Sequence, residues 1–181
     1  IAMDLKHLNE NRKEMTQQGV EEAQALIERE GLNTRKVLVL YLPHCHESLA
    51  GIIAGRIREK YGKPVFVLTS GEEGVKGSGR SIEAYSMYEE MSKCKDLFIK
   101  YGGHKMAAGL SLPAEHVRPF MERIEQECTL EPEDFVEKVH IDIQMPFHYV
   151  SHELLNQFSL LEPLGNGNRK PLLAQKDVEL I

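Results

Sequence analysis

A short glycine-rich segment contains the first residues that could bind an anion. It alternates small and polar residues: Lys76, Gly77, Ser78, Gly79, Arg80 and Ser81. Glycines allow backbone N–H groups to approach a ligand, and an arginine guanidinium can donate two hydrogen bonds to a phosphate or a carboxylate. The segment therefore predicts a phosphate-binding element, although short Gly/Ser runs are more often plain turns.

A second segment combines paired glycines with a titratable side chain. Gly102, Gly103 and His104 follow an expected helix, and residues 107–109 are small. Successive backbone amides can be exposed after such a helix, and the histidine can donate to an anionic oxygen or transfer a proton. A C-capping glycine pair before a tightly packed strand would explain the glycines, but it would not explain His104.

The pair His44 and His46, on either side of Cys45, is the best candidate for metal binding in the sequence. Acidic partners at helical or strand spacing are missing nearby, and two histidines in a loop are more often structural or substrate-contacting. We therefore expect no metal site in this chain, and we keep His46 as a candidate substrate contact.

The elements that must position these residues begin with an alternating pattern. Apolar residues at helical spacing predict one long helix in residues 1–31. The uninterrupted apolar run at 37–42 indicates a strand buried on both faces. An amphipathic helix over 49–61, closed by Gly62, then leads to a second buried strand at 64–68. Together these elements predict a βαβ unit.

The rest of the chain extends this pattern. We expect extended backbone at 75–81, a helix at 82–101, a strand at 107–112 and a helix at 117–128. This order predicts an α/β fold, in which helices flank a mixed β-sheet. After an acidic linker, a strand at 139–143 and a helix at 151–161 are expected. The three expected parts are the connecting helix 1–31, a substrate-gripping domain 32–130, and residues 131–181, which hold the linker and the start of a further domain.

Composition excludes several classes of protein. The chain has 22 basic and 28 acidic residues, a net charge of −6, which argues against nucleic-acid binding driven by bulk charge. No apolar run is long enough to cross a bilayer. The three cysteines are widely spaced, which is typical of free thiols in the cytoplasm. Because the chain starts with Ile1, we expect it to be part of a longer protein.

The two glycine-rich segments together resemble a known signature. Gly-Ser-Gly-Arg-Ser at 77–81, followed by Gly-Gly-His-x-x-Ala-Ala-Gly at 102–109, resembles the DHH-associated domain of the DHH phosphoesterase superfamily. Residues 46–56 are similar to the His-Pro-Gly-x-x-Gly-Ile-x-Ala-x-Arg stretch of RecJ single-strand exonucleases. Residues 9–12 resemble the Asn-x-x-Arg start of their connecting helix. Residues 162–168 resemble the Glu-Pro-Phe-Gly-x-Gly-Asn motif that opens their OB-fold.

Three positions depart from these motifs. Glu47 stands in place of proline, Leu164 in place of phenylalanine, and Arg169 in place of the proline after Gly-x-Gly-Asn. The Asp-rich and Asp-His-His segments that bind metal in this superfamily lie N-terminal to the long helix, and nothing in this chain matches them. The chain alone is therefore expected to be inactive, with no catalytic residue and a truncated OB-fold.

The resemblance implies a division of labour. In RecJ-like enzymes a DHH domain binds two divalent ions, Mn²⁺ or Mg²⁺, while the DHH-associated domain holds the single strand. The residues expected to contact phosphate or single-stranded DNA are Gly77, Ser78, Gly79, Arg80, Ser81, Gly102, Gly103, His104 and His46. Arg80 would hold a phosphate with help from the serines, and residues 102–104 would form a second phosphate cradle.

The implied function is the nucleic-acid-binding part of a RecJ-type, single-stranded-DNA-specific 5′→3′ exonuclease of DNA repair and recombination. Its expected partners are single-stranded DNA and a single-stranded-DNA-binding protein or helicase, in the cytoplasm and without a membrane. Two alternatives remain open. One is a DHH-family phosphodiesterase of cyclic dinucleotides or short RNA, and the other is a non-catalytic DNA-binding or scaffold protein.

Overall fold

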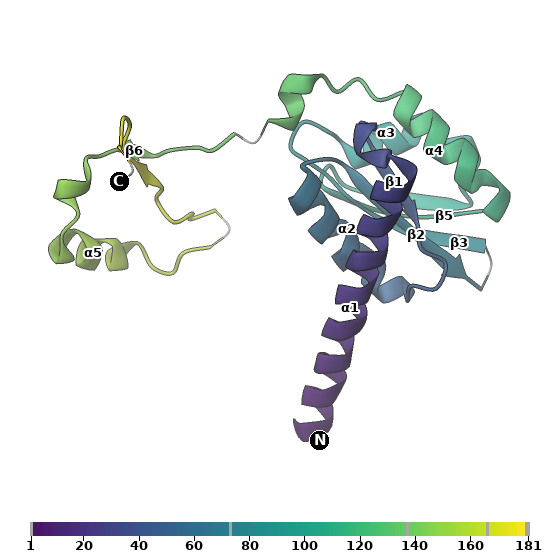
Figure 1. The fold of residues 1–181 in the computed structure, drawn as a ribbon, viewed down its shortest axis with the longest axis horizontal. Helices are drawn as coiled ribbons and strands as arrows, with labels where there is room; N and C mark the ends of the chain where they lie inside the picture. Colours follow the sequence, from purple (N-terminus) through teal and green to yellow (C-terminus); the bar gives the residue numbers. More distant parts are fainter. Residues whose placement is uncertain (1, 73, 137, 166, 180–181) are drawn as a thin grey trace. The chain divides into compact units, whose positions relative to one another are not determined.

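The computed structural model describes residues 2–72, 74–136, 138–165 and 167–179. The chain divides into two compact units, residues 1–136 and residues 137–181 (Figure 1). The first unit contains both glycine-rich segments. None of the described helices is long and apolar enough to cross a membrane.

The first unit is built around a mixed sheet, as predicted, and this sheet has five strands, one more than the sequence pattern indicated. Its strands lie in the order β1-β2-β3-β5-β4. They span Leu38–Tyr41 (β1), Val65–Gly71 (β2), Gly74–Arg80 (β3), Lys100–Gly103 (β4) and Ala107–Leu112 (β5). β1 and β2 are parallel, and the other neighbours are antiparallel. The parallel pair needs a crossover connection, which the predicted helix between the two strands provides.

Helices cover the two faces of the sheet and form a separate core on each. α1 (Ala2–Glu30) and α2 (Glu47–Tyr61) cover one face, where Ile27 and Ile53 are fully buried. α3 (Met87–Lys93) and α4 (Val117–Gln126) cover the other face. There Phe66 and Phe120 pack edge to face with ring centroids 5.2 Å apart. Short 3₁₀ turns at Leu32–Thr34, Lys95–Leu97 and Ala114–His116 connect these elements.

The ends of the first two helices follow the sequence prediction. Gly31 follows α1 with φ 63°, and Gly62 follows α2 with φ 64°. This left-handed backbone is the conformation in which glycine, without a Cβ, ends a helix at little cost. The expected long helix, the amphipathic helix and both buried strands are therefore confirmed.

The expected helix over 82–101 is wrong. Only Met87–Lys93 is α-helical, and a 3₁₀ turn then leads into the edge strand β4. In β4, Tyr101 pairs with Leu110 of β5 and packs on the ring of Phe98 at 5.3 Å. The aromatic side chains whose spacing suggested one helix belong to a helix, a turn and a strand. These three elements border the same core, which is why their apolar residues resembled a helical pattern. As a consequence, Gly102 and Gly103 lie in a strand and do not follow a helix.

The second unit is small and mostly exposed. Its expected helix is confirmed as α5 (His152–Phe158) with a 3₁₀ turn, Ser159–Leu161. The expected strand at 139–143 is reduced to β6 (Ile143–Gln144), which pairs in parallel with β7 (Leu173–Ala174). Two further 3₁₀ turns span Pro132–Phe135, in the first unit, and Phe147–Tyr149. Asn166 of the motif at 162–168 lies outside the described residues.

A single carboxylate from α4 fixes the start of β1. Glu125 accepts hydrogen bonds from the backbone N–H of Lys36 at 2.9 Å and from that of Val37 at 3.0 Å. These two N–H groups come before the first paired residue of β1, so the sheet offers them no carbonyl acceptor. The carboxylate of Glu125 accepts their hydrogen bonds instead.

We therefore predict that Glu125→Ala destabilises the first unit. Two partly buried N–H groups would lose a charged acceptor, which lowers the free energy of unfolding by about 1–3 kcal/mol. Glu122→Ala on the same helix is the control, because among the described residues Glu122 forms only an exposed ion pair with Arg118. Urea unfolding followed by circular dichroism measures both variants. Equal stability of the two variants would contradict the anchoring role.

Candidate nucleic-acid interface

The strand β3 carries glycine on one face because neighbouring side chains fill the space there. A Cβ on Gly77 would overlap the side chain of Leu68, and a Cβ on Gly79 would lie 2.9 Å from Phe66 Cε1. β3 also pairs along its length with β2 and β5, so the sheet uses its backbone N–H groups. Gly77 and Gly79 therefore serve packing, and the expectation that they expose amides to a ligand is wrong.

The opposite face of β3 carries the polar residues of the same segment. Because side chains alternate along a strand, Lys76, Ser78 and Arg80 share this face. The strand register extends it across β5 and β4 in three rows: Arg80–Ala107, Ser78–Gly109–Gly102 and Lys76–Ser111–Lys100. We call these eight residues the open face, since none of them is buried and none has a large apolar side chain.

Arg80 is held between β3 and α2. Its Nη1 donates to the carbonyl oxygen of Gly79 at 2.8 Å. Its Nη2 lies over Gly51 of α2, where a Cβ would come within 2.7 Å. Among the residues that the structure describes, the guanidinium makes no other hydrogen bond. It is therefore partly fixed while it keeps N–H donors for a ligand oxygen.

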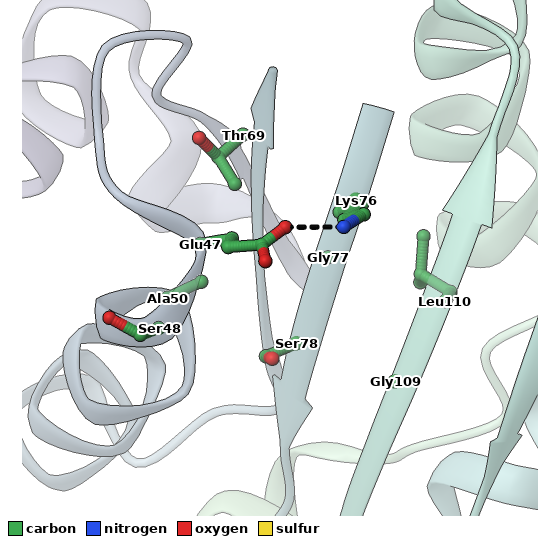
Figure 2. Close-up of a pocket in the computed structure, with 9 residues that line it drawn as sticks. All are labelled: Glu47, Ser48, Ala50, Thr69, Lys76, Gly77, Ser78, Gly109 and Leu110. Carbon is green, nitrogen blue, oxygen red and sulfur yellow. Dashed lines mark ion pairs between the residues drawn. The ribbon is translucent and has the colours of Figure 1, made fainter. Parts of the chain in front are cut away.

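A pocket of about 320 Å³ lies between the start of α2 and the sheet, next to Ser78 of the open face. Its lining comes from α2 (Glu47, Ser48, Ala50), β2 (Thr69), β3 (Lys76, Gly77, Ser78) and β5 (Gly109, Leu110). Figure 2 shows the carboxylate of Glu47 and the ammonium of Lys76 turned toward one another, and this ion pair is 2.6 Å long. The hydrogen bond from Lys76 lowers the pKa of Glu47 below its usual value.

His46 fixes the beginning of α2 next to this pocket. Its Nδ1 accepts a hydrogen bond from the backbone N–H of Ser48 at 3.2 Å, so the imidazole caps the helix. The same nitrogen lies 2.7 Å from Ser48 Oγ. The structure therefore brings His46 close to the residues of the first glycine-rich segment, and the side chain remains exposed.

Ser81 does not belong to this surface. It is only 1% exposed, and its hydroxyl donates to the carbonyl oxygen of Tyr85 at 2.6 Å. Its backbone N–H donates to the carbonyl oxygen of Met106 at 3.0 Å. Ser81 fixes the turn after β3, and the expectation that it contacts substrate is corrected accordingly.

The second glycine-rich segment adjoins the open face at β4. Gly103 approaches β5 so closely that a Cβ would lie 2.6 Å from Ala108 Cα, whereas a Cβ on Gly102 would meet nothing within 4 Å. The backbone N–H of His104 donates to the carbonyl oxygen of Ala107 at 2.8 Å, and its side chain is exposed. Because Ala107 pairs with Arg80, the two segments lie two strand spacings apart, about 10 Å.

Lys100 and Ser111 are members of the open face that the sequence analysis missed. They were missed because residues 82–101 were expected to form a helix, whereas Lys100–Gly103 form the strand β4. In this strand Lys100 and Gly102 lie on one face, and Tyr101 and Gly103 lie on the other. Within the described ranges, no group of three His, Cys, Asp or Glu residues converges as a metal site would require.

Two protein families match most of the chain. The DHHA1 domain family matches residues 34–130, and the RecJ OB domain family matches residues 141–181. The single-stranded-DNA-specific exonuclease RecJ of Bacillus subtilis is 31% identical over 175 residues, which cover 94% of this chain. The RecJ of Thermus thermophilus is 34% identical over 137 residues. The chain spans 22% and 20% of the lengths of these two relatives.

Solved structures agree with these matches. RecJ from Thermus thermophilus in complex with Mn²⁺ superimposes with a TM-score of 0.82 and 31% identity, over 95% of this chain and 25% of that one. An exonuclease RecJ bound to manganese gives a TM-score of 0.64 and 30% identity, over 72% of this chain and 32% of that one.

The close approach at Gly103 generates a prediction. Gly103→Ala should lower the free energy of unfolding by about 1–3 kcal/mol, because the new Cβ meets backbone atoms that cannot move aside independently. Gly102→Ala is the matched control, since its Cβ has open space, and it should raise the free energy of unfolding by about 0.5–1 kcal/mol. Urea unfolding compares the two variants. A Gly102→Ala variant as unstable as Gly103→Ala would contradict this geometry.

Proposed function

The chain belongs to the DHHA1 domain family in its RecJ form, and on this premise we propose that it is the single-strand-binding part of a RecJ-type 5′→3′ exonuclease. The substrate of the parent protein would be single-stranded DNA, as the names of the relatives state for them. DNA repair and recombination are the processes in which such an enzyme would act.

The observation that carries this proposal is the position of Arg80 and Ser78 on the open face. Arg80 offers guanidinium donors beside the exposed side of Ser78, and a phosphate oxygen could accept from both. Hydrogen bonds to charged groups contribute about 1.5–3 kcal/mol, more than the usual contribution of a neutral hydrogen bond. Glycine at 102 and 109 leaves space for the sugar-phosphate backbone to lie against the sheet.

The turn after β4 supports a second phosphate contact. The exposed imidazole of His104 can donate to a phosphate oxygen, and Gly103 gives the turn its close approach to β5. His46, at the start of α2 next to the pocket-lining residues Glu47 and Ser48, would contact the strand near the pocket. Arg80, His104 and His46 would thus contact the strand from three elements around one surface.

The residues described here do not fit a two-metal site. Structures of relatives are in complex with Mn²⁺ or Mg²⁺, but within the described parts of this chain no three suitable ligands converge. Any such ions would be bound by the remainder of the parent protein. The role that we propose for this chain is to hold and orient the strand.

The match to the RecJ OB domain at 141–181 favours this function over a phosphodiesterase of cyclic dinucleotides or short RNA. Enzymes of that second kind share the Gly-Gly-His segment but normally lack the motif that opens an OB-fold. No specific observation favours a non-catalytic scaffold.

We predict that the 181-residue chain alone does not cleave DNA. Because its described residues offer no metal site, labelled single-stranded DNA should remain intact after incubation with Mn²⁺. Gel electrophoresis of the DNA at increasing times measures this. Degradation that EDTA abolishes, by a preparation free of other nucleases, would contradict the division of roles.

We also predict that Arg80→Ala weakens binding of a single-stranded oligonucleotide about tenfold, because it removes charge-assisted hydrogen bonds to phosphate. Arg118→Ala is the control: it removes the same charge from the exposed surface of α4 and should change affinity less than twofold. Fluorescence anisotropy at several salt concentrations gives both affinities, and a shallow salt dependence is expected from few phosphate contacts. Equal affinities for both variants would contradict the proposed site.

A further inference from the structure

The ion pair between Glu47 and Lys76 connects two different elements that line the pocket. Glu47 lies in the first turn of α2 and Lys76 in β3, and their charged atoms are 2.6 Å apart. Figure 2 shows both side chains directed at the space that Ser78 also borders. A ligand that enters this pocket would meet a carboxylate and an ammonium that already neutralise each other.

Folding stability does not account for this ion pair. Both side chains are 51% exposed, and exposed ion pairs contribute little to the free energy of unfolding. Other exposed pairs, whether on one helix (Arg118 with Glu122) or between elements (Lys105 with Glu83, Arg123 with Asp96), do not line this pocket. The Glu47–Lys76 pair instead lines a pocket on the surface for which we have argued nucleic-acid binding.

Lys76 lies on β3 on the same face as Arg80 and Ser78, two residues further along the strand from Ser78. Alternate residues on one face of a strand are about 7 Å apart, so Lys76 lies about 13 Å along β3 from Arg80. Lys100 shares its row on the open face, two strands away. A single strand held by Arg80 through one phosphate could therefore reach Lys76 with a later one.

We infer that Glu47 acts as an internal competitor of DNA, because its carboxylate takes the position at Lys76 that a phosphate of the bound strand would otherwise take. The inference rests on the proposed function and assigns a residue that sets the affinity of this second phosphate subsite. A tethered carboxylate is present at a high effective concentration, so a phosphate must displace it at a cost. The positive N-terminal end of α2 also favours Glu47 in its charged form.

Four variants of the full 181-residue chain test this inference. Glu47→Gln keeps the shape of the side chain but removes its charge, and it should tighten binding of a fluorescent oligothymidylate of about 15 nucleotides roughly threefold to fivefold at low salt. Lys76→Ala should weaken binding, and the double variant should bind no more tightly than Lys76→Ala. Glu122→Gln on α4 changes the net charge equally and should leave affinity almost unchanged. Circular dichroism confirms that each variant is folded.

The outcomes separate this inference from the proposed function. The gain from Glu47→Gln should shrink as salt rises, because screening weakens the competition. A gain no larger than that of Glu122→Gln, or one that persists without Lys76, would overturn the competitor role. If Arg80→Ala still weakens binding in that case, only this inference fails. If Arg80→Ala has no effect either, the proposed function fails with it.

Discussion

The absence of space on one face of β3 is the constraint on which the rest of the interface depends. Phe66 and Leu68 of β2, Leu110 of β5 and Met87 of α3 occupy the volume that side chains at positions 77 and 79 would need. Glycine there lets β3 lie flat between its neighbours, which places Lys76, Ser78 and Arg80 together on the other face. Larger residues would push the strand toward α2, where Arg80 already touches Gly51.

The few cations on the open face contribute through where each of them lies, because the chain as a whole is negatively charged. The chain carries a net charge of −6, so it repels nucleic acid at long range, and under the proposed function binding requires short contacts that offset this repulsion. The cations on the open face are Arg80, Lys76 and Lys100, and Glu47 opposes one of them directly. A surface with so few cations is sensitive to single substitutions in a way that a broad basic patch is not.

The sequence was sufficient for the elements whose hydrophobic pattern has a clear period. The helices α1, α2 and α4, the glycines that end α1 and α2, and the strands β1, β2 and β5 all follow from it. β4 could not be predicted, because Tyr85, Met91, Leu97 and Phe98 border one core at spacings that resemble a single helix running on into Tyr101. The burial of Ser81 and the pairing of Ser78 with Gly109 depend on tertiary contacts, which no local pattern encodes.

The glycines of the two segments differ in what the fold requires of them. Gly77, Gly79 and Gly103 each lie where a Cβ would meet neighbouring atoms at 3 Å or less, whereas a Cβ on Gly102 meets nothing within 4 Å and one on Gly109 meets only a carbonyl oxygen at 3.9 Å. Glycine inside a strand costs about 0.5–1 kcal/mol relative to alanine. Packing therefore gives no reason for Gly102 and Gly109, which pair with each other beside Ser78. Under the proposed function, the close approach of a bound single strand supplies a reason for glycine at these two positions.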